Sequence, residues 1–64
     1  MSIFEMMVEA RAMRGRNRRN GAIRILTGLA LNKLARGLDA LARQHLQDAR
    51  QAERSAEQSA RDWA

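Results

Sequence analysis

The sequence predicts an all-α protein, and two observations support this prediction. Over residues 23–63, apolar side chains recur at helical spacing and fall on one arc of a helical wheel drawn at about 100° per residue. Alanine, leucine, arginine and glutamine are abundant and proline is absent, which is the composition of a helical protein. At 64 residues the chain is one domain, so we predict a single helical domain over residues 1–64.

A short first helix is expected over about residues 3–14. Ser2 and Glu5 have the spacing of a capping box, in which the serine caps the helix and the glutamate reaches back to the cap. The predicted helix has one apolar face, made by Ile3, Met6, Met7, Ala10 and Met13. Phe4 and Val8 lie on a second side, beside Arg11. Either both sides belong to the core, or Phe4 and Val8 form an exposed docking surface together with the adaptable methionines.

An arginine-rich turn is expected at about residues 15–21. Two glycines, two asparagines and three arginines in these seven residues disfavour a helix interior and favour a turn. Asn20 is suited to cap the helix that follows. The first helix should therefore fold back on the second as a hairpin.

A long second helix is expected over about residues 22–62. At 1.5 Å per residue it would be about 60 Å long, and the first helix could cover only part of its apolar arc. Leucines dominate the first half of this arc and alanines the second half. Two chains paired antiparallel would pack large residues against small ones. We therefore predict an antiparallel helical homodimer, with an interface made by Leu31, Leu34, Leu38, Leu41, Ala42, His45, Ala49, Ala52 and Ala56.

Two further features of the second helix fit this dimer. Residues 22–31 are apolar nearly all round, and Ile25, Leu26 and Leu29 fall outside the main arc, so this segment should be buried on several sides. His45 is the only histidine and lies near the expected crossing point of the two chains. It is interpreted as an interface residue rather than a metal ligand or a pH switch.

Positive charge is concentrated in the first part of the chain. The net charge is +5, and eleven of the twelve basic residues are arginine, a residue suited to bidentate recognition of carboxylate or phosphate. A phosphate-bearing ligand, an acidic protein or a simply solvated turn would each fit this cluster. The predicted partner-binding residues are Phe4, Met7, Val8, Arg11, Arg14, Arg16, Arg18, Arg19 and Arg24.

The sequence offers little for catalysis, and we expect no enzyme, no cofactor and no metal site. It has no cysteine or tyrosine, and no phosphate-binding loop or metal-ligand spacing. No signal peptide is recognisable, and the longest apolar run is too short to span a bilayer, so a cytoplasmic protein is expected.

These features favour a small non-enzymatic protein that binds another protein and modulates its activity. Adaptors and inhibitors of this kind are common among phage and bacterial accessory factors, an analogy of type and not of sequence. The alternative is a nucleic-acid-binding regulator that uses the arginine-rich turn. A third hypothesis is binding to an anionic membrane surface through the basic, amphipathic residues 3–31.

Overall fold

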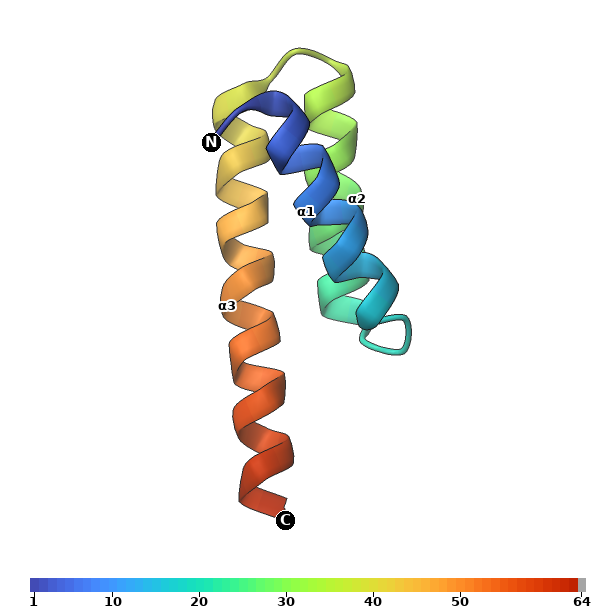
Figure 1. Ribbon diagram of the computed structural model, residues 1–64, viewed down its shortest axis with the longest axis vertical. Helices are drawn as coiled ribbons and strands as arrows, with labels where there is room; N and C mark the ends of the chain where they lie inside the picture. The colour runs from blue at the N-terminus through green and yellow to red at the C-terminus, as the bar shows by residue number, and fades with distance from the viewer. Residues whose placement is uncertain (64) are drawn as a thin grey trace.

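The computed structural model describes residues 1–63, which form three α-helices and no strand. α1 spans Ile3–Arg16, α2 spans Gly21–Ala35 and α3 spans Asp39–Trp63. α2 and α3 run antiparallel, and α1 packs mainly against α2 (Figure 1). The all-α prediction is therefore confirmed.

The two predicted helix caps are present. The Ser2 hydroxyl accepts a hydrogen bond from the Glu5 amide at 3.1 Å, and the Glu5 carboxylate accepts one from the Ser2 amide. The Asn20 side chain accepts a hydrogen bond from the Ile23 amide at 3.1 Å and caps α2. α1 ends two residues later than predicted, so the turn is shorter, over residues 17–20.

The prediction of one continuous helix over residues 22–62 is wrong, because the chain turns back at Gly37. The Leu38 amide donates to the Lys33 carbonyl at 2.8 Å, and the Gly37 amide donates to the Leu34 carbonyl at 3.1 Å. This pair of bonds is a Schellman motif, which ends a helix with a residue in the left-handed conformation. Gly37 has a φ of 76°, a conformation that glycine adopts without the steric cost a Cβ would bring.

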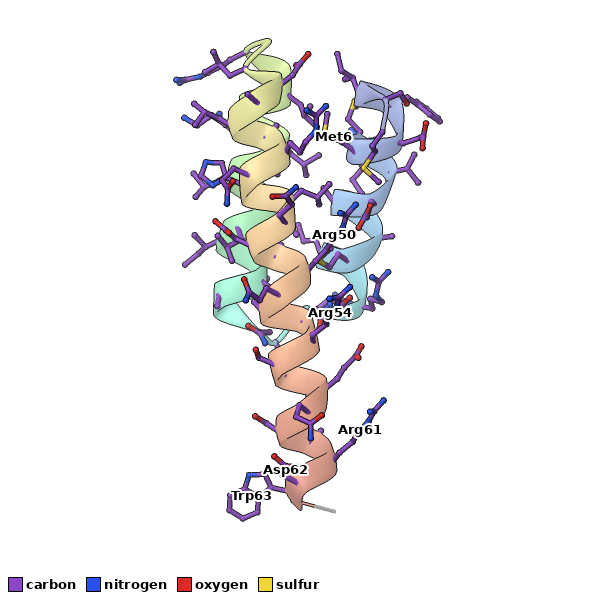
Figure 2. All side chains as sticks on the ribbon, turned by 90° about the vertical axis from the view of Figure 1, so that its left-hand side faces the viewer. Met6, Arg50, Arg54, Arg61, Asp62 and Trp63 are labelled. Atoms are coloured by element: carbon purple, nitrogen blue, oxygen red, sulfur yellow. The ribbon has the colours of Figure 1, made fainter. Side chains whose placement is uncertain are left out.

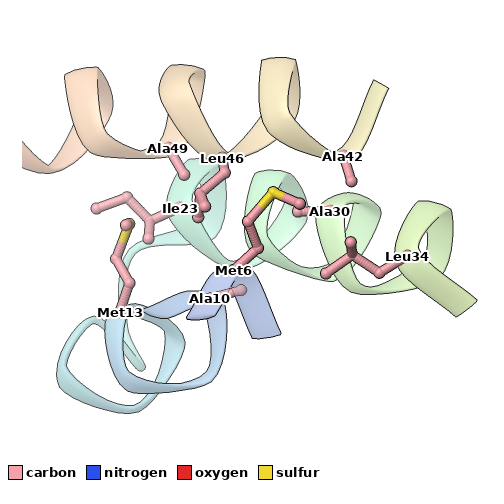
Figure 3. Close-up of a cluster of buried hydrophobic side chains, with 9 residues drawn as sticks. All are labelled: Met6, Ala10, Met13, Ile23, Ala30, Leu34, Ala42, Leu46 and Ala49. Atoms are coloured by element: carbon pink, nitrogen blue, oxygen red, sulfur yellow. The ribbon is translucent and has the colours of Figure 1, made fainter. Parts of the chain in front are cut away.

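The turn lets α2 and α3 cover each other within one chain. Small residues of α3, Ala42 and Ala49, pack against larger side chains of α1 and α2 (Figure 3). The expected packing of large residues against small ones is therefore found inside a single chain. The buried apolar residues are Met6, Ala10, Met13, Ile23, Ala30, Leu34, Ala42, Leu46 and Ala49.

α3 is longer than its neighbours and extends past them. Its 25 residues span about 37 Å, which accounts for most of the 41 Å length of the molecule. The arginine-rich turn lies beside the middle of α3, where Arg16 and Asn17 reach Glu53. Beyond this level α3 continues alone, and Trp63 near its end is 91% exposed (Figure 2).

Candidate functional site

The outward side of α1 carries exposed apolar side chains. Phe4 is 72% exposed and Val8 is 51% exposed. Met6, Ala10 and Met13 fill the core on the other side of the helix, so Phe4 and Val8 are not needed there. Of the two interpretations left open by the sequence, burial of Phe4 and Val8 in the core is wrong, and both side chains are exposed. We call Phe4, Val8 and the half-buried Met7 the α1 apolar surface.

Four arginines gather around an open hollow between α1 and α2. Arg11, Arg14 and Arg18 come from α1 and the turn after it, and Arg24 comes from the first turns of α2. Gly15 lines the same hollow. We call this group of four side chains the arginine hollow.

Arg14 differs from the other three arginines in its packing. It is half-buried, and its guanidinium lies across α2 at Gly28. A Cβ at position 28 would lie only 2.8 Å from a guanidinium nitrogen of Arg14. The absence of a side chain at Gly28 therefore makes room for the charged group.

Arg16 and Arg19 do not line the arginine hollow, although they border a neighbouring depression together with Arg18. Arg16 points to the opposite side of α1 and forms a bidentate ion pair with Glu53 of α3, with its Nη2 2.9 Å from a carboxylate oxygen. Glu53 also accepts a hydrogen bond from Asn17. Arg19 is exposed in the turn. Arg16 is therefore a structural residue that ties the end of α1 to α3.

A second ion pair joins the same two helices. Arg50 of α3 points towards α1 and donates two hydrogen bonds to the Glu9 carboxylate, one of them 2.6 Å long (Figure 2). The hydrogen bond from Arg50 lowers the pKa of Glu9, and the hydrogen bonds from Arg16 and then Asn17 lower the pKa of Glu53. Both carboxylates are thus stabilised in their charged form.

The predicted dimer-interface residues divide into three groups. Leu34, Ala42 and Ala49 are buried in the core of their own chain. Leu31, His45, Ala52 and Ala56 are half-buried. Leu38 and Leu41, near the Gly37 turn, are 42% and 48% exposed. The three buried residues are thus already in use within the hairpin.

The expectation that residues 22–31 are buried on several sides is wrong for the outer side of α2. Ile25 is 66% exposed and Leu29 is 38% exposed. Both line a shallow depression beside Arg14, Arg24 and Gly28. Both residues lie outside the main apolar arc, and that position alone does not distinguish burial from exposure. Ile25 and Leu29 thus form an apolar border of the arginine hollow that the sequence pattern did not predict.

The described residues 1–63 hold neither a metal-binding cluster nor a membrane-spanning helix. Within this range, no three histidine, cysteine, aspartate or glutamate side chains come together as metal ligands would. None of the three helices combines the length and the apolar character needed to cross a bilayer. Comparisons with protein-family models, with characterised proteins and with solved structures give no significant match.

The two ion pairs predict a dependence of stability on pH. Because folding lowers the pKa of Glu9 and Glu53 below their ordinary value of 4.5, the stabilisation should be complete well above pH 4.5. It should be lost as the pH falls below 4.5 and through the lowered folded-state values. Urea unfolding between pH 7 and pH 3 should show this loss in the free energy of unfolding.

Replacing both carboxylates isolates their contribution. Glu9→Gln with Glu53→Gln should be less stable than the wild type at pH 7 and should lose less stability on acidification. Asp62→Asn is the control, because Asp62 is exposed and forms no ion pair within residues 1–63. An acid sensitivity of the double variant equal to that of the wild type would contradict this assignment.

Proposed function

We propose that this protein is a non-enzymatic interaction module that binds an acidic partner protein and modulates its activity. The observation that carries the proposal is the exposure of Phe4 on a helix whose opposite side already fills the core. Large exposed apolar side chains grouped on one helix face are typical of a docking surface. The α1 apolar surface is of the kind that a partner groove accepts, and methionine adapts to such contacts.

The charge of the chain supports an acidic partner. Arg11 borders the α1 apolar surface, and the net charge of +5 attracts a negatively charged protein. Attraction of this kind raises association rates and opposes binding to basic proteins. In this proposal the apolar side chains supply most of the affinity, and the charge selects the partner and speeds the encounter.

Truncation of the α1 apolar surface tests the proposal. Phe4→Ala with Val8→Ala should reduce partner capture by about tenfold or more, equivalent to about 1.4 kcal/mol. The fold should persist, because both side chains are largely outside the core. Quantitative mass spectrometry of proteins captured from cell lysate measures the loss, and circular dichroism checks the fold.

Two matched controls separate a specific surface from general stickiness. Leu38→Ala with Leu41→Ala removes exposed apolar side chains at the Gly37 turn and should leave capture unchanged. Arg11→Glu should weaken capture, whereas Arg43→Glu on the exposed side of α3 should have little effect. The proposal fails if the wild type captures no specific protein, or if the Phe4 and Val8 changes unfold the chain.

We also propose that the predicted antiparallel homodimer forms by opening of the Gly37 turn. Leu34, Leu38 and Ala42 stay on one helical arc if the chain continues as a helix through residue 37. Two opened chains would then exchange α3, and each would make with its partner the contacts that α2 and α3 make within one chain. Such an exchange of identical elements is a low-cost route to a dimer.

The residue at position 37 should control this equilibrium. Alanine in the left-handed conformation costs about 1–2 kcal/mol, and it also favours a continuous helix over glycine by roughly 0.5–1 kcal/mol. Gly37→Ala should therefore shift the chain from monomer towards dimer in sedimentation equilibrium. Gly37→Asn should remain closer to the wild type, because asparagine tolerates the left-handed conformation. If Gly37→Ala is as monomeric as the wild type, the exchanged dimer is excluded.

A further inference from the structure

The arginine hollow is a concentration of positive charge without nearby compensation. None of its four arginines forms an ion pair with a carboxylate of residues 1–63, whereas Arg16 and Arg50 both do. Arg11 and Arg14 are three residues apart on one side of α1, and Arg18 lines the same hollow from the turn after α1. The Glu9 carboxylate of α1 does not compensate these arginines, because it accepts hydrogen bonds from Arg50 of α3.

The beginning of α2 adds to this positive potential. Arg24 is the fourth residue of α2, and no acidic residue occupies the first turn of that helix. The amino end of a helix carries a partial positive charge, so a cation there is unfavourable unless an anion is close. Within residues 1–63 no side chain supplies that anion. A bound anionic ligand would relieve the repulsion.

Gly28 leaves room for one guanidinium of the arginine hollow. Because position 28 has no side chain, Arg14 lies half-buried against α2 beside Arg24. A guanidinium that is already positioned loses less freedom when it binds a phosphate in a bidentate manner. Arg14 is thus packed against α2 next to Gly28, whereas Arg11, Arg18 and Arg24 are exposed.

We propose that the arginine hollow binds the phosphate backbone of a nucleic acid. Two arginines of α1, one of the following turn and one of α2 line the same hollow, and four such cations fit a polyanion better than a single carboxylate. Of the two aromatic residues in the sequence, Trp63 lies near the far end of α3, and Phe4 is about two helical turns from Arg11. No aromatic side chain lines the hollow for base stacking. Base stacking therefore has no part in the proposed binding, and the proposed contacts of the four guanidinium groups are to phosphates.

This proposal does not rest on the proposed protein-binding function, because Arg14, Arg18 and Arg24 take no part in that function and only Arg11 is common to both. Four guanidiniums neutralising up to four phosphates give an expected slope of log K against log salt of about −3 to −4. The probe is a fluorescein-labelled 20-base-pair DNA duplex of mixed sequence. Its fluorescence anisotropy is measured against protein concentration at several salt concentrations, starting at low salt.

Two variants test the geometry of the hollow. Arg14→Gln with Arg24→Gln should reduce the affinity for DNA by about tenfold or more. The slope of log K against log salt should become less negative by about two. Gly28→Ala keeps every charge and places a Cβ where the Arg14 guanidinium lies. It should reduce affinity by several-fold. The fold should tolerate it, because the atom displaced is the end of a flexible side chain and alanine is a better helix former than glycine.

Matched controls decide between a site and diffuse attraction. Arg43→Gln with Arg54→Gln removes the same charge from exposed positions on α3 and should change affinity less than twofold. Phe4→Ala with Val8→Ala should leave DNA binding intact, which separates a failure here from a failure of the protein-binding proposal. Equal losses for the Arg43 and Arg54 pair and for the Arg14 and Arg24 pair would overturn the proposal.

Other ligand classes are distinguished in the same experiment. Absence of wild-type binding at tens of micromolar protein in low salt would overturn the nucleic-acid proposal. Retention on vesicles of phosphatidylserine and phosphatidylcholine, without DNA binding, would assign the hollow to anionic lipid instead. If Gly28→Ala leaves the affinity for DNA unchanged, the placement of Arg14 against Gly28 does not contribute to binding, and the proposed geometry of the hollow is wrong.

Discussion

The left-handed conformation of Gly37 is the constraint on which the three-helix arrangement depends. It ends α2 with two backbone hydrogen bonds and sends α3 back along α2, where Ala42 and Ala49 approach closely. The same turn places α3 next to α1, and the two helices are joined by the Arg16–Glu53 and Arg50–Glu9 ion pairs. α1 is held with its core side inward, so its other side is exposed. The α1 apolar surface and the arginine hollow both follow from this placement.

The elements that the sequence predicts well are those determined locally. Ser2, Glu5 and Asn20 cap helices through groups only three residues apart, so their roles can be deduced without the fold. The break at Gly37 is different, because the apolar arc continues through Leu38 without a gap. Glycine disfavours a helix by only about 1 kcal/mol, which packing can outweigh. The motif of Gly37 followed by an apolar residue was the available signal for the turn.

The candidate site was predictable only in part, since exposure is a property of the whole fold. Phe4 and Val8 are apolar, and a helical wheel cannot tell whether a second helix covers their side. Ile25 and Leu29 were expected to be buried, but the two helices packed on α2 leave its outer side open. The sequence does not distinguish Arg16 from the neighbouring arginines. Its partner Glu53 is 37 residues later in the chain and is brought within hydrogen-bonding distance only by the fold. The four arginines of the hollow form no such ion pair within residues 1–63.

The intrachain return of α3 along α2 is the central claim, and a distance measurement between spin labels tests it most directly. Labels on Ala22→Cys and Gln51→Cys would sit on exposed positions near Ile23 and Ala49, which lie together in the core (Figure 3). The doubly labelled protein is diluted with unlabelled protein so that only distances within one chain contribute. We predict a short distance, set by the roughly 8–10 Å separation of packed helices and the reach of the labels. In protein that sedimentation shows to be monomeric, a distance near 44 Å, expected for 29 residues of continuous helix at about 1.5 Å per residue, would contradict the account.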